Sequence, residues 1–178
     1  MTISLILATI CASSAFTPEE PTLNDKLVAW SKEQVGYAQG RGECTDFILA
    51  GLKAVGAKTN RSFRDDPNNG DYVWGEHIGT LYVASNGRAV FEWVDPKNKA
   101  KAGDILQFRN VKIKVPRTSV PAQFRHHTAL LEMTSDDQRR WTMLHQNVNG
   151  KRTVQRHTFQ MSRLTGGWIG VYRPQPIK

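Results

Sequence analysis

Three polar segments, widely separated in the chain, contain the residue types that cysteine-based catalysis needs. They hold Cys44, then His127, and then His145 together with Asn147. Nucleophilic cysteine catalysis requires a thiolate, a histidine that exchanges a proton with it, and a polar group that orients the imidazole ring. The segments occur in that chain order, so they predict a site with Cys44 as nucleophile, His127 as base and Asn147 as orienting residue.

Cys44 is predicted to lie in the first turn of a buried helix. Apolar residues recur after it with helical spacing, and Gly56 is a helix stop signal. The recurring positions are Phe47, Ile48, Leu49, Leu52 and Val55. In a first turn, the unpaired backbone N–H groups and the positive end of the helix dipole favour a thiolate. An inert thiol buried in the core is the alternative reading of Cys44.

His127 and Asn147 are predicted to lie on neighbouring strands. Residues 127–131 and 141–147 are typical of strands, and the polar run 134–138 indicates the hairpin turn between them. Antiparallel neighbours place the start of one strand beside the end of the other. Only one of His126 and His127 can face inward, because side chains alternate along a strand. We expect this to be His127, which shares a face with Ala129 and Leu131, while His126 faces solvent.

The motifs around these residues resemble those of the CHAP and NlpC/P60 superfamily of papain-like cysteine amidases and peptidases. They are the segments 42–47, 102–108, 127–131 and 145–147, and the Cys-Thr pair and the Asn are closer to CHAP. The resemblance implies Cys44 as nucleophile and His127 as base, with Asn147 orienting His127. His145 stands where CHAP domains commonly have an acidic residue, and it or Tyr37 could border the cleft. It also implies a peptide or amide substrate, with peptidoglycan the expected one.

The rest of the sequence predicts a single α+β domain of papain-like architecture, with N-terminal helices packed on an antiparallel sheet. A helix capped by Asn24 and ended by Gly36 comes first, and strands are expected only from residue 91 onward. Asp104 is expected to cap a turn before its strand. The expected strands are 105–108, 111–115, 127–131, 141–147 and 168–173.

The N-terminus predicts export. Residues 1–15 form a short apolar run with small residues at the end, which is typical of a signal peptide. Residues 16–24 would then be a linker and residues 25–174 the domain. We expect a secreted, periplasmic or cell-envelope protein, monomeric and without a transmembrane segment in its mature chain. Cys44 would then have no disulfide partner, because the other cysteine, Cys11, is removed with the signal.

Charge and histidine spacing leave alternatives to an enzyme. The formal net charge is +8 at pH 7, which is compatible with an anionic envelope polymer. The basic residues form no known nucleic-acid motif, so no specific nucleic-acid partner is expected. No zinc-binding spacing links the histidines, and no cofactor is expected. A secreted binding module that keeps the fold without catalysis is the second hypothesis.

Overall fold

The computed structural model describes residues 19–64, 71–116 and 121–177. This part of the chain contains two α-helices, seven β-strands and two short 3-10 helices. The helices are α1 (Leu23–Glu33), α2 (Cys44–Ala54), η1 (Asn60–Ser62) and η2 (Met161–Arg163). The strands are β1 (Glu76–Val83), β2 (Ala89–Trp93), β3 (Ile105–Ile113), β4 (Ala122–Thr134), β5 (Arg140–His145), β6 (Gln155–Gln160) and β7 (Leu164–Arg173).

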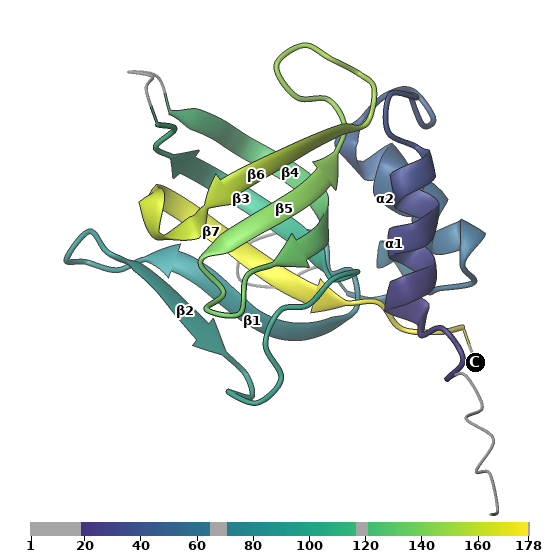
Figure 1. The fold of residues 1–178 in the computed structure, drawn as a ribbon, viewed down its shortest axis with the longest axis horizontal. Coiled ribbons are helices and arrows are strands. Elements are labelled where there is room, and N and C mark those ends of the chain that lie inside the picture. The colour runs from purple at the N-terminus through teal and green to yellow at the C-terminus, as the bar shows by residue number, and fades with distance from the viewer. Residues whose placement is uncertain (1–18, 65–70, 117–120, 178) are drawn as a thin grey trace, which may run out of the picture.

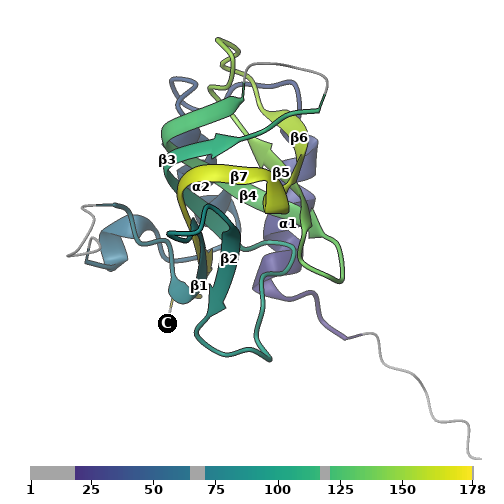
Figure 2. The same cartoon turned by 90° about the vertical axis from the view of Figure 1, so that its left-hand side faces the viewer.

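The strands form one antiparallel sheet that curls strongly, with both helices on its outer side (Figures 1 and 2). The strand order is β2-β1-β7-β3-β4-β5-β6. Phe91 in β2 lies against Trp141 in β5, with ring centroids 5.9 Å apart, although four strands separate β2 from β5 in the sheet. The concave side therefore encloses a core of its own, and the helices form a second core on the convex side.

Side chains of the central strands alternate between these two cores. In β4, Ala129 and Leu131 belong to the interior cluster, whereas Leu130 packs with the helices. Neighbouring strands follow the same period of two, which is the geometry of a pleated strand. Strands that bury apolar side chains on both faces lose the simple contrast between an apolar and a polar face.

The α+β architecture with helices first agrees with the structure, and several element boundaries differ from the prediction. Helix α2 begins at Cys44 as expected, and Gly56 follows it with φ +70°. Helix α1 is capped by the Thr22 hydroxyl, not by Asn24. The two strands expected within 105–115 are one strand, β3, and the structure adds β1, β2 and β6. Residues 1–15 and the first three residues of the expected linker, 16–18, lie outside the described residues, and the last two linker residues belong to helix α1.

Neither described helix is long and apolar enough to cross a lipid bilayer.

Asp104 joins the N-terminal helix to the last strand. Its carboxylate, fully buried, accepts hydrogen bonds from Arg173 Nε at 3.0 Å and Nη2 at 2.9 Å. It also accepts from the amide of Asn24 at 3.1 Å and from the backbone N–H of Lys101 at 2.9 Å. The last contact confirms Asp104 as a turn cap, and the other two tie helix α1 and strand β7 to the beginning of β3.

Replacing Asp104 by Ala should strongly destabilise the domain. The change leaves the guanidinium of Arg173, whose side chain is only 13% exposed, without its counter-charge, and breaking a buried pair typically costs about 3–5 kcal/mol. Urea unfolding followed by circular dichroism measures this cost. The matched control is Asp136→Ala on the exposed hairpin turn, which should change the free energy of unfolding by less than about 0.5 kcal/mol. Equal effects of the two substitutions would contradict the role given to Asp104.

Candidate functional site

Cys44 is a free, partly exposed cysteine at the first position of helix α2. Phe47 and Ile48, three and four residues further along, are buried in the core that the helices share with the sheet. Residues at this spacing lie on the same face of a helix. The thiol is therefore on the side of α2 that faces the sheet, at the open end of the helix where backbone N–H groups are unpaired.

Gln146, directly after β5, holds the loop that leads into helix α2. Its buried amide donates to the carbonyl oxygens of Glu43 at 2.7 Å and Gln39 at 2.9 Å. Its side-chain oxygen accepts from the Gln39 N–H at 2.8 Å. Gly40 completes the loop, since it has φ +58° and a Cβ there would lie 2.8 Å from the Asp46 side chain. Cys44 thus starts its helix from a turn anchored to the end of β5.

His126, on β4, lies on the face of the sheet that the helices cover. It pairs with Arg109 in β3, and two residues further along the same face Thr128 pairs with Gln107. The Nε2 atom of His126 lies 2.8 Å from Oδ1 of Asp71, and its ring stacks on Tyr72 with centroids 5.7 Å apart. Its side chain is 42% exposed. His126 is therefore oriented by a carboxylate and remains accessible to solvent.

Asp71, in the segment before β1, is completely buried. Besides the His126 contact, it accepts hydrogen bonds from Gln107 Nε2 at 3.1 Å and Arg109 Nε at 2.8 Å. Gln107 in turn accepts from the indole N–H of Trp74 at 2.9 Å. A buried charge requires such partners. The only feature of the sequence that could have indicated a buried Asp71 is its position directly before the apolar run 72–74.

The topology brings the beginning of β4 and the beginning of α2 to the same region of the sheet. Strands β4 and β5 are antiparallel with Leu130 opposite Leu144, so the end of β5 lies toward the beginning of β4. The Gln146 amide attaches α2 at this end. Cys44 and His126 therefore belong to one face and one end of the sheet, with Asp71 beside the imidazole.

His127 does not lie on that face. It points into the concave interior, where it is 6% exposed and stacks on Phe124 with ring centroids 5.1 Å apart. Burial, and to a smaller extent the charge of His126, lower the pKa of His127 to about 3. The expected face shared with Ala129 and Leu131 is confirmed, but this face is turned away from α2. A neutral, enclosed imidazole there is poorly placed to exchange a proton with the Cys44 thiol.

Asn147 does not contact the histidine that it was expected to orient. The exposed Asn147 amide donates to Glu43 Oε2 at 2.6 Å, and Arg152 donates to Glu43 Oε1 at 2.7 Å. Asn147 thus supports the residue before Cys44 and does not orient His127. Tyr37 is 67% exposed, and its backbone carbonyl accepts from the Val154 N–H at 2.8 Å. This contact attaches the backbone at Tyr37 to the segment before β6.

His145 joins two other histidines into a hydrogen-bonded chain across three strands. His127 Nε2 lies 3.0 Å from His145 Nδ1, and His145 Nε2 lies 2.8 Å from His157 Nδ1. Burial lowers the pKa of His145 well below its ordinary value and also lowers that of His157. The ring nitrogens bond one another in series and do not converge on one point. Within residues 19–64, 71–116 and 121–177, no group of His, Cys, Asp and Glu is arranged to hold a metal ion.

These features define a papain-like cysteine proteinase-fold domain, with a cysteine at a helix start and a histidine on the facing sheet. Residues 18–178 match the AIM3/BBC1 cysteine proteinase-fold domain, and the chain belongs to this family. The match supports the papain-like fold and does not test the finer resemblance to CHAP or NlpC/P60.

One curated relative and two solved structures show further similarity. Altered inheritance of mitochondria protein 3 from Debaryomyces hansenii is 28% identical over 154 residues, which is 84% of this chain and 16% of that protein. The crystal structure of Ly7917 aligns over 86% of this chain and 63% of its own, with TM-score 0.49 and 17% identity. The crystal structure of Ly7917 with the hydrolyzing product of MDP aligns over the same 86% of this chain and 63% of its own, with TM-score 0.45 and 18% identity.

The interior histidines should make the domain less stable in mild acid. Their folded-state pKa values lie below the value of about 6.5 for an unfolded chain, so below that pH the unfolded state binds more protons than the native state. The contribution of these histidines to the free energy of unfolding is fully present well above pH 6.5 and is lost as the pH falls toward 3. Two such histidines should lower the free energy of unfolding by about 2–3 kcal/mol between pH 7.5 and 5.5.

Urea unfolding of the wild type and of His127→Phe at these two pH values measures the effect. The variant lacks one of the two titrating rings and keeps an aromatic side chain beside Phe124. Its loss of stability on acidification should be about half that of the wild type. Identical pH dependence of the two proteins would show that His127 binds protons equally well in the native and unfolded states, which contradicts the lowered pKa.

Proposed function

We propose that this domain is a cysteine-nucleophile hydrolase of amide bonds in peptides, with Cys44 as nucleophile, His126 as base and Asp71 as the group that orients the base. The observation that carries the proposal is the contact between His126 and the buried carboxylate of Asp71 on the face covered by helix α2. A nucleophile, a base and a group that orients the base are the components of the Cys-His catalytic arrangement.

The proposed reaction follows from the two nitrogens of His126. Its Nε2 atom faces Asp71, which favours the tautomer with the proton on Nε2 and leaves Nδ1 to accept the thiol proton. The Cys44 thiolate attacks the amide carbonyl carbon, and N–H groups at the helix start stabilise the oxyanion. The C–N bond breaks as the imidazolium protonates the leaving amine. Water, deprotonated by Nδ1, then cleaves the thioester and restores the thiol.

The substrate is proposed by chemical class. Peptide amides fit the family's cysteine proteinase fold, and peptidoglycan remains a proposed member of this class. A secreted location likewise remains a prediction from residues 1–15. The curated relative is a yeast protein named for mitochondrial inheritance, and this chain spans 16% of its length. Peptide segments of proteins are therefore the broader substrate class to test first.

Activity should depend on His126 and not on His127. Hydrolysis of a mixed peptide library and of purified peptidoglycan can be followed by mass spectrometry. Cys44→Ala should abolish cleavage, and His126→Ala should reduce it by about 10²–10⁴-fold, the usual contribution of a general base. Asp71→Asn should reduce it less, because the ring and the amide contacts remain. His127→Phe is the matched control at the adjacent position and should retain cleavage per folded molecule.

The rate of Cys44 alkylation by iodoacetamide distinguishes an enzyme from a binding module. An imidazole that takes the thiol proton makes the sulfur more reactive, so His126→Ala should slow alkylation at neutral pH while His127→Phe does not. If His127→Phe abolishes cleavage and His126→Ala retains it, the assignment of the base is wrong. If Cys44 reacts only after denaturation and no substrate is cleaved, the domain is a papain-like module without this catalytic activity.

A further inference from the structure

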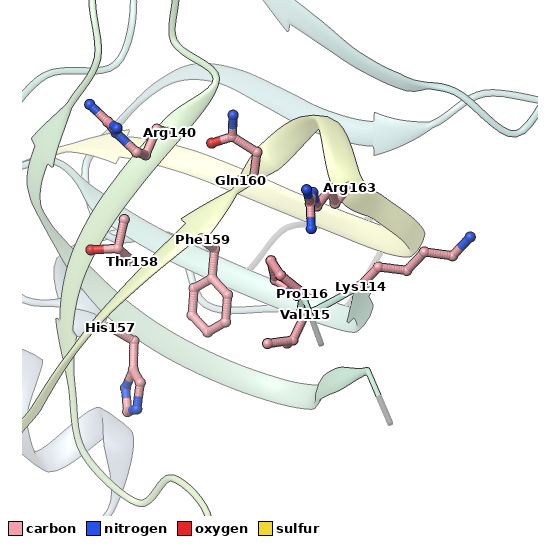
Figure 3. Close-up of a pocket in the computed structure, with 9 residues that line it drawn as sticks. All are labelled: Lys114, Val115, Pro116, Arg140, His157, Thr158, Phe159, Gln160 and Arg163. Atoms are coloured by element: carbon pink, nitrogen blue, oxygen red, sulfur yellow. The ribbon is translucent and has the colours of Figure 1, made fainter. Parts of the chain in front are cut away.

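The edge of the sheet opposite β2 is bordered by a basic pocket that the proposed active site does not use. A pocket of about 380 Å³ lies between β6 and the segment that follows β3 (Figure 3). Basic side chains line one part of the pocket and apolar side chains line another. These residues are Lys114, Arg140 and Arg163, then Val115, Pro116 and Phe159, with His157, Thr158 and Gln160 from β6. A smaller pocket of about 170 Å³ shares Val115, His157 and Phe159 and extends the hollow toward Phe124.

The lining of the pocket is basic, and an adjoining hollow that shares Arg140 and Gln160 contains Asp136 and Asp137. No Asp or Glu is among the residues that line either pocket. The structure records no ion pair between Lys114 or Arg163 and a described acidic residue, while Arg140 lies near Asp137 of the hairpin turn. Lys151 adds a further positive charge near His157. Such a cluster favours an anionic occupant.

Strand β6 presents an unpaired edge beside this pocket. Among the described strands, β6 pairs only with β5, so the backbone N–H and C=O groups on its other side have no strand partner. His157 and Phe159 point toward the interior and are partly buried, whereas Arg156, Thr158 and Gln160 are exposed. An added strand would have the same alternation, so every second side chain would point toward the apolar part of the pocket.

We infer that this edge binds an acidic peptide from another protein as an added β-strand. The edge supplies hydrogen bonds that require a peptide backbone, which a phosphate or a lipid headgroup cannot provide. The apolar wall formed by Phe159, Val115 and Pro116 accepts an apolar side chain. Lys114 and Arg163 then pair with acidic side chains on either side of it. The chain's own first 18 residues contain no acidic residue, so charge argues against them as the occupant.

Fluorescence anisotropy with a labelled synthetic peptide tests the inference. The probe alternates Glu with Val and Phe over eight residues, and its counterpart has Lys in place of every Glu. The protein carries Cys44→Ala, so the proposed hydrolase cannot cleave the probe and a failure of catalysis cannot be mistaken for a failure of binding. The acidic probe should bind and the basic one should not.

Two variants and one modified probe locate the binding site. Lys114→Glu and Arg163→Glu, both at exposed positions, should each weaken binding at least tenfold. The control Lys26→Glu changes the net charge equally at an exposed position of α1 and should leave affinity within about twofold, because salt screens distant surface charges. A probe with alternate N-methylated amides keeps its charges but cannot pair with β6, and should bind at least tenfold more weakly.

Backbone amide exchange measured by NMR gives an independent readout. The acidic probe should slow exchange within Gln155–Gln160. Equal binding of the N-methylated probe would overturn the inference, because the site would then be a general polyanion patch. Binding of phosphatidylserine vesicles that is lost in Arg163→Glu, without binding of the peptide, would identify a membrane surface and also overturn it.

Discussion

The alternation of β4 between two apolar environments determines which side chains can reach the cysteine. The sheet is covered by helices on its convex side and closes around a second core on its concave side. Successive residues of β4 therefore enter different cores, and neither face is left to solvent over the middle of the strand. His126 and His127 are adjacent in sequence but belong to different chemical environments. The first contacts a carboxylate and solvent, and the second contacts aromatic rings and other imidazoles.

Burial of Asp71 makes the position of His126 well defined. A carboxylate that is buried from solvent needs hydrogen-bond donors as partners. Gln107 and Arg109 on β3 donate these hydrogen bonds. His126 approaches the same carboxylate from the neighbouring strand, while Tyr72 covers one face of its ring. The imidazole is thus fixed by the adjacent residues Asp71 and Tyr72, and β3 in turn fixes Asp71. This is how a partly exposed histidine can keep one orientation without being enclosed.

The sequence predicted the helix that carries Cys44, the order of helices before strands, and the strands that carry His127 and His145. These elements are governed by local periodicity and by stop signals such as Gly56, which a single sequence records. The sequence did not predict correctly which face of β4 points toward helix α2. Ala129 and Leu131 looked like the core face, but Leu130 and Thr128 are equally buried, so the period of two could not tell the helix side from the interior.

The same error of one residue occurred on β5. The motif 145–147 drew attention to His145 and Asn147, while Gln146 between them holds the loop before α2. Asp71 was missed for another reason. Its burial depends on β3 and β4, which lie far along the chain, and no local pattern records such long-range contacts. The short strand β6 has only six residues and an alternation of polar with aromatic side chains, which is a weak signal next to a turn.

The two histidine systems differ in access to protons, and this difference supports His126 as the reactive group. Proton exchange with a substrate requires an imidazole that is both oriented and reachable. The His127–His145–His157 chain is oriented, but its members are kept neutral by burial, and two of them are almost fully enclosed. Its hydrogen bonds instead connect β4, β5 and β6 across the interior. Among the described strands β6 pairs only with β5, and these hydrogen bonds help to hold it against the sheet beside the basic pocket.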